Sequence, residues 1–420
     1  MRDFPTDFLW GSATAAHQVE GGNTNSDWWE WEHRADSPAK ESSADGIDHW
    51  NRYDQDFALL AALGQNAHRF SVEWARIEPA EGEFSQSAID HYRRVLESLH
   101  RHGLTPFVTL YHFSLPRWFA ERGGWLGADA VGLFGRYVER AVSALGDLAP
   151  YFGTVNEPQM VALMGYLAGG HPPGRRDIES AKQVNQTLAT AHRVAVSAVR
   201  AGSGTSRVGT CLNLPHIEPF RPEEAADVAT AARMTAFFAD THIDDLRSAP
   251  DPGDFVGVQY YSRNLADGTS PAMTAPPPAD AELSQIGWEI YPQGLGPVLR
   301  KAAEAGLPVM VTENGIAALD DEQRVRFLAS HLREVRSAVQ DGVDVRGYFH
   351  WSAFDNYEWG TFEPRFGLIG VDHEAGMRRI VRPSVAYYGQ VASTGDLEPL
   401  LQVARRLETD SRSADRRSTS

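Results

Sequence analysis

Two short segments of the sequence each place a glutamate directly after an apolar, β-branched run. They are Thr154-Val155-Asn156-Glu157-Pro158 and Val311-Thr312-Glu313-Asn314-Gly315. Such runs are typical of buried strands, so each glutamate is expected where a strand enters a loop. Two facing carboxyl groups can cleave a glycosidic bond. One donates a proton to the departing oxygen, and the other attacks or stabilises the anomeric carbon, at a separation of roughly 5 to 5.5 Å in a retaining site.

The elements that position these glutamates follow from the alternation of short apolar runs with longer amphipathic stretches. Eight runs are predicted to be strands: Phe8–Ala13, Ala67–Val72, Pro106–Tyr111, Tyr151–Asn156, Arg207–Asn213, Asp254–Tyr260, Pro308–Thr312 and Val345–Trp351. The stretches between and after them have helical periodicity: Tyr53–Leu63, Ala88–His102, Leu133–Leu145, Ala181–Ala201, Ala225–Asp245, Leu295–Ala305, Glu322–Gln340 and Ser384–Val391.

Strands that alternate with helices form parallel sheets with right-handed crossovers, and eight such units close into a (β/α)8 TIM barrel. In that fold the active site lies at the C-terminal ends of the strands. Polar or aromatic residues stand there in the expected strands: Arg69, His112, Asn156, Glu157, Asn213, Tyr261, Glu313 and Trp351. A doubly wound open sheet is the alternative fold, but no Gly-x-Gly-x-x-Gly or Walker-type loop follows an early strand.

Length and composition allow the barrel to be one domain. The chain has 420 residues, of which 42% are hydrophobic and 23% charged, as in an ordinary globular protein. We expect a catalytic domain over residues 1–402 and a mobile tail over residues 403–420, where Arg, Asp and Ser predominate. The segment Asp267–Asp280, with three successive prolines, is expected to be a surface loop that shapes an entrance.

The charge of the chain excludes several classes of partner. A formal net charge of −17 repels phosphate backbones and anionic lipid, so we expect no nucleic acid and no membrane surface as a partner. No apolar run approaches the ~20 residues of a membrane span, and the N-terminus does not resemble a cleaved signal. The single cysteine, Cys211, forms no internal disulfide and is expected to be a small buried strand residue. These features favour the reducing cytoplasm.

Motifs over nearly the whole chain resemble glycoside hydrolase family 1. Both glutamate segments belong to this resemblance, and the other motifs follow in the family's order: Phe4-Pro5 through Trp10-Gly11 to Gln18-Val19-Glu20-Gly21, Arg69-Phe70-Ser71, Tyr111-His112, Gly123-Gly124-Trp125, Gly287-Trp288-Glu289, Trp351-Ser352 through Asp355-Asn356-Tyr357-Glu358-Trp359, and Arg365-Phe366-Gly367. An Asn-Glu-Pro alone is a weak signal. Two glutamate motifs in order on the fourth and seventh strands are a strong one.

The resemblance implies a role for each glutamate. Glu157 would be the general acid/base and Glu313 the nucleophile of a double displacement that retains the anomeric configuration. The charge of Glu313 should raise the pKa of Glu157, while Arg69 and a hydrogen bond from Tyr261 would keep Glu313 deprotonated. The structural alternative is that both glutamates are solvated, inert carboxylates at the barrel top.

The resemblance also implies a sugar pocket built from Gln18, His112, Asn156, Trp351, Glu358 and Trp359. Glu358 and Gln18 would bind the far edge of a hexose, Asn156 its 2-hydroxyl, and Trp351 would lie under the ring. Taken singly, these residues have structural explanations, such as core packing for Trp351 or a satisfied buried imidazole for His112.

Three positions depart from the commonest family pattern. His17 stands where tyrosine is frequent, Phe113 where tryptophan is frequent, and Gln259 where asparagine is frequent. The glutamine is longer by one methylene, so the bonding around the catalytic pair is expected to differ. Relatives that act on phosphorylated sugars have a smaller polar residue and a nearby cation at the position of Glu358. We therefore expect unphosphorylated substrates.

Together these observations predict a β-glycosidase that hydrolyses terminal, non-reducing β-D-glucosides, with galactosides and fucosides left open. The predicted partner is a small-molecule β-glycoside, with no cofactor and no metal, because hydrolysis by paired carboxyls needs none. A transglycosidase with the same intermediate, and a non-catalytic carbohydrate-binding protein, are the alternatives. The sequence leaves the leaving group and homo-oligomer formation open.

Overall fold

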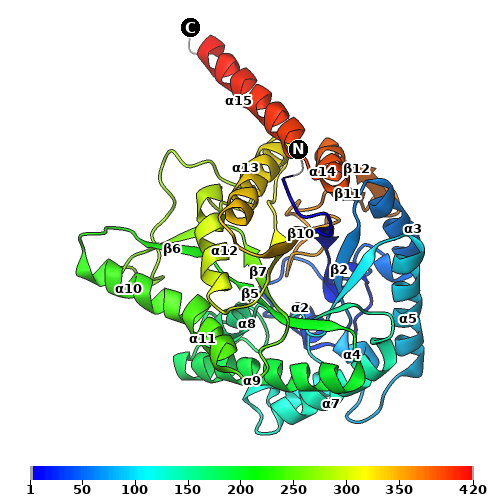
Figure 1. Cartoon of the computed structure of the whole chain (residues 1–420). Coiled ribbons are helices and arrows are strands. Elements are labelled where there is room, and N and C mark those ends of the chain that lie inside the picture. The colour runs from blue at the N-terminus through cyan, green and yellow to red at the C-terminus, as the bar shows by residue number, and fades with distance from the viewer. Residues whose placement is uncertain (1–2, 419–420) are drawn as a thin grey trace.

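Eight parallel strands close into one barrel in the computed structural model, which describes the backbone of residues 3–418 and the side chains of residues 3–409 (Figure 1). Around the barrel the order is β1-β10-β9-β7-β5-β4-β3-β2. The strands are β1 (Leu9–Ala13), β2 (Ala67–Ser71), β3 (Thr105–Thr109), β4 (Tyr151–Asn156), β5 (Arg207–Asn213), β7 (Phe255–Tyr260), β9 (Val309–Asn314) and β10 (Val345–Trp351). This is the (β/α)8 TIM barrel predicted from the sequence.

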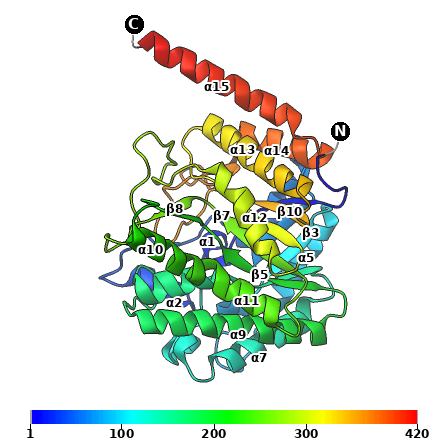
Figure 2. The same ribbon diagram turned by 60° about the vertical axis from the view of Figure 1, so that its left-hand side comes forward.

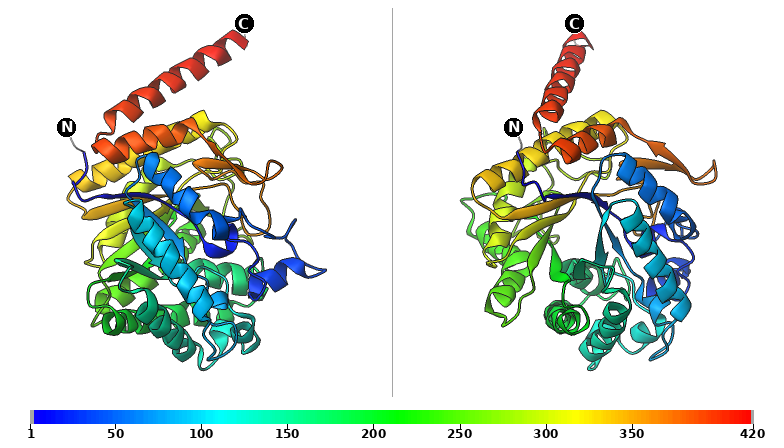
Figure 3. Two further views of the ribbon diagram at one scale, coloured as in Figure 1. Left: turned by 90° about the vertical axis from the view of Figure 1, so that its right-hand side faces the viewer. Right: turned by 45° about the vertical axis from the view of Figure 1, so that its right-hand side comes forward.

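Long helices form the outer layer around the barrel (Figures 2 and 3). They are α3 (His49–Ala62), α5 (Gln86–Arg101), α7 (Ala130–Leu145), α9 (Ile178–Gly202), α10 (Ala225–Thr235), α11 (Thr241–Ser248), α12 (Leu295–Ala303), α13 (Asp321–Gln340) and α14 (Pro383–Thr394). In α5, Ile89, Tyr92, Leu96 and Leu99 recur at helical spacing and are buried, so one face packs on the barrel. None of the described helices is long and apolar enough to cross a membrane.

Shorter helices lie mainly in the loops at the C-terminal ends of the strands, where the sequence predicted none. They are α1 (Ala16–Val19), α2 (Asp27–His33), α4 (Trp74–Ile77), α6 (Arg117–Glu121), α8 (Pro158–Ala162), the 3-10 turns Gly124–Leu126 and Pro292–Gly294, and the π-helical turn Leu163–Leu167. A second π-helical turn, Ala236–Asp240, joins α10 to α11 inside the stretch Ala225–Asp245, which was predicted as helix. Helices of four to seven residues are too short to show a hydrophobic period, which explains why they were missed.

Aromatic rings fill the barrel below these loops. Phe107 of β3 contacts Phe255 and Phe349 edge-on, with ring centroids 5.4 and 5.5 Å apart. Cys211 of β5 is fully buried beside them, as predicted, and is a free thiol. Gly209 leaves the room for this packing, because a Cβ there would lie 2.3 Å from the carbonyl oxygen of Phe255. The barrel interior is therefore a packed core that closes the space below the C-terminal ends of the strands.

Two small sheets extend the barrel. β6 (His216–Pro219) and β8 (Arg263–Ala266) pair in parallel just beyond the ends of β5 and β7, and β11 (Ile369–Asp372) pairs with β12 (Arg378–Val381) in antiparallel fashion. The sequence predicted neither sheet, since four-residue strands carry little alternation. The segment Asp267–Asp280, predicted as a loop, follows β8 and contains no helix or strand.

The C-terminal helix α15 (Glu398–Ser418) leaves the body of the barrel beside α13 and α14 (Figures 1 and 2). Its first turns are anchored, because Leu400, Leu401 and Ala404 are buried in the same core cluster as α13 and α14. The predicted boundary between residues 402 and 403 thus falls inside a helix. The mobility of the tail and the extent of the domain stay predictions.

Candidate active site

A cavity of about 250 Å³ opens at the C-terminal end of the barrel. It brings together Glu157, directly after β4, and Glu313, near the end of β9, although 156 positions separate them in the sequence. The other residues that line it come from several loops and strand ends: His112, Phe113, Asn156, Met160, Met164, His171, Asn213, Tyr261, Trp288, Trp351, Glu358, Trp359 and Phe366.

Glu313 is held by three donors. Arg69 Nη1 donates to Oε1 at 2.5 Å, Gln259 Nε2 donates to the same oxygen at 2.8 Å, and Tyr261 OH donates to Oε2 at 2.5 Å. Arg69 has no solvent exposure and forms a buried ion pair with Glu313. Both carboxylate oxygens are therefore fixed in direction, and a positive charge lies against one of them.

The chain around Glu313 is equally constrained. The next residue, Asn314, donates from Nδ2 to the carbonyl of Tyr260 at 2.7 Å and accepts from Tyr348 OH at 2.7 Å. Gly315 then passes so close to β10 that a Cβ would lie 1.6 Å from the carbonyl oxygen of Trp351. The end of β9 is thus fastened to both neighbouring strands, and only glycine fits after it.

Glu157 lies at the start of α8 with a left-handed backbone, at φ 44°, and Pro158 occupies the first position of the helix. Its N–H continues the barrel ladder by donating to the carbonyl of Cys211 at 2.8 Å. The side chain receives one hydrogen bond, from Asn213 Nδ2 to Oε1 at 2.7 Å. Strained backbone of this kind is concentrated at functional sites.

Burial and mutual charge shift the pKa of both glutamates. Burial, and then the nearby charge of Glu313, raise the pKa of Glu157 to about 8. Burial also raises the pKa of Glu313 above its ordinary value, but Arg69 and the Tyr261 hydroxyl lower it in opposition. Only Glu313 has a cation in contact, so a proton shared by the pair belongs on Glu157.

A third carboxyl group, that of Glu358, lies in the same cavity. It accepts a hydrogen bond from Trp351 Nε1 at 3.0 Å. Burial and the charge of Glu313 raise its pKa to about 8, against the hydrogen bonds of Trp351, Asn356 and Gln18. Gln18 is buried behind the cavity wall and donates to Asn356 Oδ1 at 2.9 Å, and its own Oε1 has no partner in the described part of the chain.

Asn156 connects the glutamate cluster to His112. Its Oδ1 accepts from Arg69 Nη2 at 2.5 Å and from Gln259 Nε2 at 2.7 Å, and its Nδ2 lies 3.2 Å from His112 Nε2. Burial, with the nearby charge of Arg69, lowers the pKa of His112 well below its ordinary range. The imidazole is therefore neutral, and its buried Nδ1 has no partner among the described residues. A neutral imidazole beside an amide offers fixed hydrogen bonds without adding charge.

Aromatic rings form the walls of the cavity. The ring centroids of Trp359 and Phe113 are 5.1 Å apart, and those of Trp359 and Trp28 are 4.7 Å apart. His17, one of the departures noted in the sequence, stacks parallel to Trp359 at 5.9 Å. Trp351 is buried at the base. Apolar ring faces combined with a few fixed polar groups are the composition that binds a sugar.

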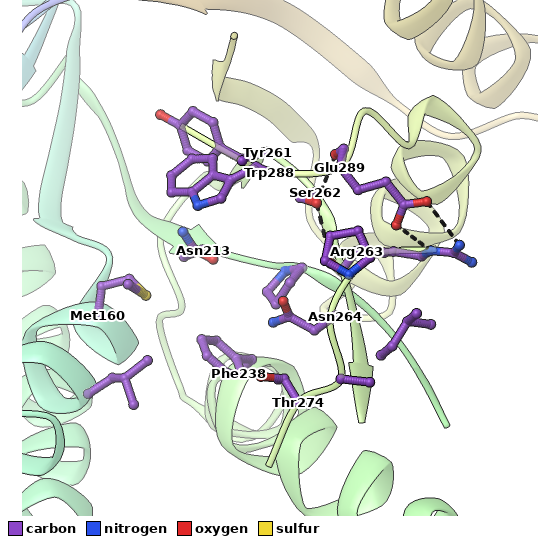
Figure 4. Close-up of a pocket in the computed structure, with 16 residues that line it drawn as sticks. Met160, Asn213, Phe238, Tyr261, Ser262, Arg263, Asn264, Thr274, Trp288 and Glu289 are labelled. Carbon is purple, nitrogen blue, oxygen red and sulfur yellow. Dashed lines mark hydrogen bonds and ion pairs between the residues drawn. The ribbon is translucent and has the colours of Figure 1, made fainter. Parts of the chain in front are cut away.

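A second pocket, of about 320 Å³, adjoins the cavity and shares Met160, Asn213, Tyr261 and Trp288 with it (Figure 4). Tyr261 and Trp288 lie together at one end, with ring centroids 5.6 Å apart. The rest of its lining comes from the two π-helical turns, the strand β8, the residues just before β6 and β8, the loop 267–280 and the segment 287–289: Leu163, Pro215, Phe238, Ser262, Arg263, Asn264, Leu265, Thr274, Ala275, Pro277, Gly287 and Glu289. The predicted entrance loop therefore does form part of a wall.

The charges in this flanking pocket are balanced internally. Arg263 donates to both oxygens of Glu289, at 2.7 and 2.9 Å (Figure 4). It also donates to Glu218 at 2.8 Å. Its guanidinium also lies 4.0 Å from the ring centroid of Tyr291. With the arginine occupied on every side, the free lining is mostly apolar, with the amides of Asn213 and Asn264 as polar points.

The structure brings the sequence-predicted site residues into one place. Eight of them line the cavity: His112, Asn156, Glu157, Tyr261, Glu313, Trp351, Glu358 and Trp359. Arg69 and Gln18 lie directly behind it, in contact with lining residues. Sequence reasoning named Asn213 as a strand-end residue and Phe366 within a family motif but gave neither a role, and it did not select Met160 or Met164. Asn213 is the hydrogen-bond partner of Glu157.

No group of three or more His, Cys, Asp or Glu side chains in the described part of the chain is arranged to hold a metal ion. His112 and His171 both line the cavity, but they project among aromatic rings. Burial lowers the pKa of His171 to about 4, so this imidazole too is neutral near pH 7. The ionisable chemistry of the cavity rests with its three carboxyl groups.

Comparison with known proteins agrees with this arrangement. The family model described as glycosyl hydrolase family 1 matches residues 1–248 and 243–397. The sequence is 33% identical to β-glucosidase A of Thermotoga maritima, with 95% of this chain and 99% of that protein covered. It is 31% identical to a bifunctional β-D-glucosidase/β-D-fucosidase of Bifidobacterium breve, with 92% and 97% covered.

Solved structures are similar over the same extent. A β-glycosidase from Pyrococcus horikoshii superposes with a TM-score of 0.89 at 36% identity, covering 96% of this chain and 98% of that one. The Thermotoga maritima β-glucosidase in complex with glucoimidazole gives a TM-score of 0.88 at 32% identity, covering 93% and 99%. The similarity in fold and in sequence to these enzymes thus extends over nearly the full length of the chain.

Proposed function

Because this chain belongs to glycosyl hydrolase family 1 and is an O-glycosyl hydrolase of the β-glycosidase type, we propose that it removes terminal, non-reducing β-D-glucosyl residues with retention of configuration. Glu313 is the nucleophile and Glu157 the general acid/base. The observation that carries the proposal is the unequal environment of two glutamates in one cavity: Glu313 with a contacting arginine, and Glu157 without one.

In the first step the Glu313 carboxylate attacks the anomeric carbon while the bond from that carbon to the leaving oxygen breaks. Glu157 gives its proton to the departing oxygen, so the aglycone leaves as a neutral alcohol. In the second step a water oxygen attacks the same carbon, Glu157 takes a proton from the water, and Glu313 leaves as carboxylate. Two inversions give net retention.

The pKa of Glu157 follows these steps. In the free enzyme, burial and the negative charge of Glu313 raise it to about 8, so Glu157 carries the proton that the first step needs. Esterification of Glu313 removes that charge, and the pKa of Glu157 then falls. The same group therefore serves as acid first and as base afterwards.

Three neighbours orient the nucleophile. Arg69, Gln259 and Tyr261 together fill the hydrogen-bonding positions of Glu313 from one side, which leaves its remaining lone pair for the substrate. Arg69 and Gln259 also bind Asn156, so the residue proposed to contact the 2-hydroxyl is positioned by the groups that hold the nucleophile. Contacts to that hydroxyl strengthen in the transition state.

Recognition of the sugar is assigned to Gln18, His112, Asn156, Glu358 and Trp359, with Trp351 under the ring. The unpartnered Gln18 Oε1 and His112 Nδ1 support this assignment, because buried polar atoms normally have partners. Galactosides and fucosides, which differ from glucosides at positions 4 and 6, belong to the same proposal. The fucosidase activity named for the Bifidobacterium breve relative supports their inclusion.

The substrate is proposed to be unphosphorylated. None of the described residues that line the cavity is a lysine or arginine, so a 6-phosphate would meet no cation there. Glu358 is a carboxyl group in either protonation state and gives a phosphate no positive charge. Preferential hydrolysis of a 6-phosphoglucoside over the neutral glucoside would contradict this part.

The leaving group is proposed to occupy the flanking pocket of Figure 4, because Tyr261 and Trp288 line both spaces. Its apolar lining suits an aryl group, and its two asparagines suit a second sugar. Residues 1–402 as the catalytic domain and a cytoplasmic location, which rests on the single cysteine, are parts of the same proposal.

Replacement of Glu313 by glycine tests the assignment directly. The variant should lose activity on an aryl β-glucoside, because no nucleophile remains, and added azide should restore turnover by attacking the anomeric carbon itself. The rescued product should be the α-glucosyl azide by NMR, since a single displacement inverts the centre. Normal turnover without azide would refute Glu313 as nucleophile, and an inverted product from the wild-type enzyme would refute retention.

A further inference from the structure

A cleft of about 490 Å³ lies away from the catalytic cavity and shares no lining residue with it. Its walls are the loop from Gly22 to Asn25, the short helix α4 and the first two turns of α5, with Trp50 of α3 at the base. The volume is within the range of pockets that bind small molecules. The proposed function gives this cleft no role.

The lining of this cleft has an unusual charge for so acidic a chain. The sequence carries 56 Asp and Glu residues, yet none of the described residues lining the cleft is one of them. Arg76, His91 and Arg94 line it instead. Arg76 is paired with the buried Glu20 at 2.9 Å, but Arg94 is exposed and makes no ion pair or hydrogen bond with any described residue. The lining of the cleft therefore carries positive charge and contains no acid that neutralises it.

His91 supplies a second, independent observation. It is only 7% exposed, lines the cleft, and has no hydrogen bond to any described residue. Its ring stacks on Trp50 at 3.5 Å, and Arg76 covers the same indole at 4.3 Å. Burial, and then the charges of Arg94, Arg76 and His49, lower the pKa of His91 to about 4. The imidazole is neutral near pH 7 and lies near the two arginines of the cleft.

The polar groups of the cleft suit an anion that carries hydroxyl groups. Ser87 lies in the first turn of α5, where Ser85 caps the N–H of Ala88 and the helix dipole favours negative charge. Thr24 and Asn23 face the same space from the loop. Asp90 and Glu97, the two acids of α5, do not line the cleft, and Asp90 accepts a hydrogen bond from Gln86 at 2.8 Å.

We propose that the cleft formed by α3, α4, α5 and the loop 22–25 binds a small phosphorylated polyol, with Arg94 and His91 on the phosphate and Thr24 and Asn23 near the hydroxyl groups. Arg76, held by Glu20, supports the phosphate through its remaining guanidinium nitrogen. The site is separate from the sugar cavity, so its ligand does not compete with the glycoside. Arginine is the residue best suited to a phosphate, because its planar donors match the oxygen geometry.

Calorimetric titration of the full-length protein tests this site at constant ionic strength. Glycerol 3-phosphate is the probe. Inorganic phosphate, which lacks the hydroxyl groups of the polyol, and glycerol, which lacks the phosphate, are the comparison ligands. We expect saturable binding of glycerol 3-phosphate, weaker binding of phosphate and none of glycerol. Arg94→Gln should weaken the binding about tenfold, the effect of losing one charge-assisted hydrogen bond, while Arg101→Gln near the other end of α5 should not.

Ser87→Glu is the sharpest variant, because a glutamate in the first turn of a helix stabilises the helix while it repels an anion. It should abolish binding and leave the melting temperature at or above that of the wild type, and Ser87→Gln should retain binding. Hydrolysis of an aryl glucoside should be unchanged in all of these variants. Absence of saturable binding, or equal weakening by Arg94→Gln and Arg101→Gln, would overturn the proposal. The outcome of this test does not depend on the catalytic roles proposed for Glu157 and Glu313.

Discussion

Three carboxyl groups and one buried cation determine the charge of the catalytic cavity. Burial raises the pKa of both Glu157 and Glu358 to about 8, and Arg69 is in direct contact with Glu313 alone. Near neutral pH the cavity therefore holds one ion pair and two protonated acids, and it is close to neutral overall. A neutral cavity suits a neutral sugar, because binding then carries no cost of desolvating an unpaired charge on either side.

Replacement of Glu157 by glutamine should separate the two steps of the reaction. The amide cannot give a proton, so kcat/KM for a phenyl glucoside should fall by about a hundredfold or more, whereas a dinitrophenyl glucoside, whose leaving group needs no proton, should still form the intermediate. The alkaline limb of kcat/KM near pH 8, which reports Glu157 losing its proton, should vanish in the variant. A limb that persists with the dinitrophenyl substrate would assign it to another group.

Gln259 is the departure from the family pattern that bears most closely on the reaction. Its Nε2 donates to both Glu313 and Asn156. Gln259→Met keeps the length of the side chain and removes both bonds, so kcat should fall about tenfold or more, with a smaller change in KM. Gln259→Asn should recover part of the loss. If the methionine variant turned over at the wild-type rate, Gln259 would have no positioning role.

The residues named from the sequence were those whose type and strand-end position coincide. Glu157 and Glu313 could be predicted because a strand run precedes each. Met160 and Met164 could not, because they reach the cavity from α8 and the π-helical turn after it, and a methionine in such a segment is indistinguishable from a core residue. The cleft that Arg94 lines could not be predicted either, because its lining residues come from four separate segments of the sequence.

At the scale of the elements, the eight barrel strands could be predicted because each is a buried run of five to seven residues. Most predicted bounds lie within two residues of those observed; β9 runs on to Asn314 and so carries Glu313 within the strand. The α15 helix was missed because Ala414 is its only apolar residue after Leu407 and its later part is rich in charge. Paired short strands such as β6 and β8 depend on contacts that sequence periodicity does not encode.

Asp27, the first residue of α2, provides a prediction at this scale. Its Oδ1 accepts from the N–H groups of Trp28 and Leu115, both at 2.8 Å, and burial raises its pKa to about 8. The folded state therefore holds a proton that the unfolded state releases near pH 4. Stability is present below that pH and is lost as the pH rises toward 8, by about 1.4 kcal/mol per pH unit at most.

Asp27→Asn keeps the accepting oxygen and removes the ionisation. The variant should melt at a higher temperature than the wild type at pH 8, and the difference should shrink toward pH 5. Thermal unfolding at several pH values measures this, with the exposed Asp45→Asn as the matched control. A variant less stable than the wild type at pH 8 would show that the carboxylate is needed in ionised form.

Over the whole molecule, buried histidines and buried acids oppose each other. Burial lowers the pKa of His68, His331 and His350 to about 3, and that of His91, His171, His192 and His242 to about 4. Unfolded histidine takes up a proton near pH 6.5, so these groups stabilise the fold above that pH and their contribution is lost as the pH falls toward 4.

The acids with raised pKa act in the other direction. Asp27, Glu157 and Glu358 keep protons in the folded state up to about pH 8, so their contribution is lost as the pH rises from about 4 to 8. Burial also raises the pKa of Glu20, Glu73 and Glu313. Below pH 6.5 the buried histidines, including His112, outnumber these acids, so stability falls as the pH is lowered. Above pH 6.5 only the acids contribute, so stability falls as the pH is raised.

The melting temperature should therefore be highest near pH 6.5 and fall on both sides. Calorimetry from pH 4.5 to 9 measures the curve, and His350→Leu isolates one contribution, because His350 is fully buried and burial lowers its pKa to about 3. In this variant the free energy of unfolding should depend less steeply on pH below pH 6.5, by at most about 1.4 kcal/mol per pH unit, which corresponds to one proton. Replacement of the exposed His33 by glutamine should leave this slope unchanged. A melting temperature that rises steadily to pH 9 would mean that the buried acids are ionised in the folded protein, and the protonated Glu157 on which the first catalytic step depends would be lost with them.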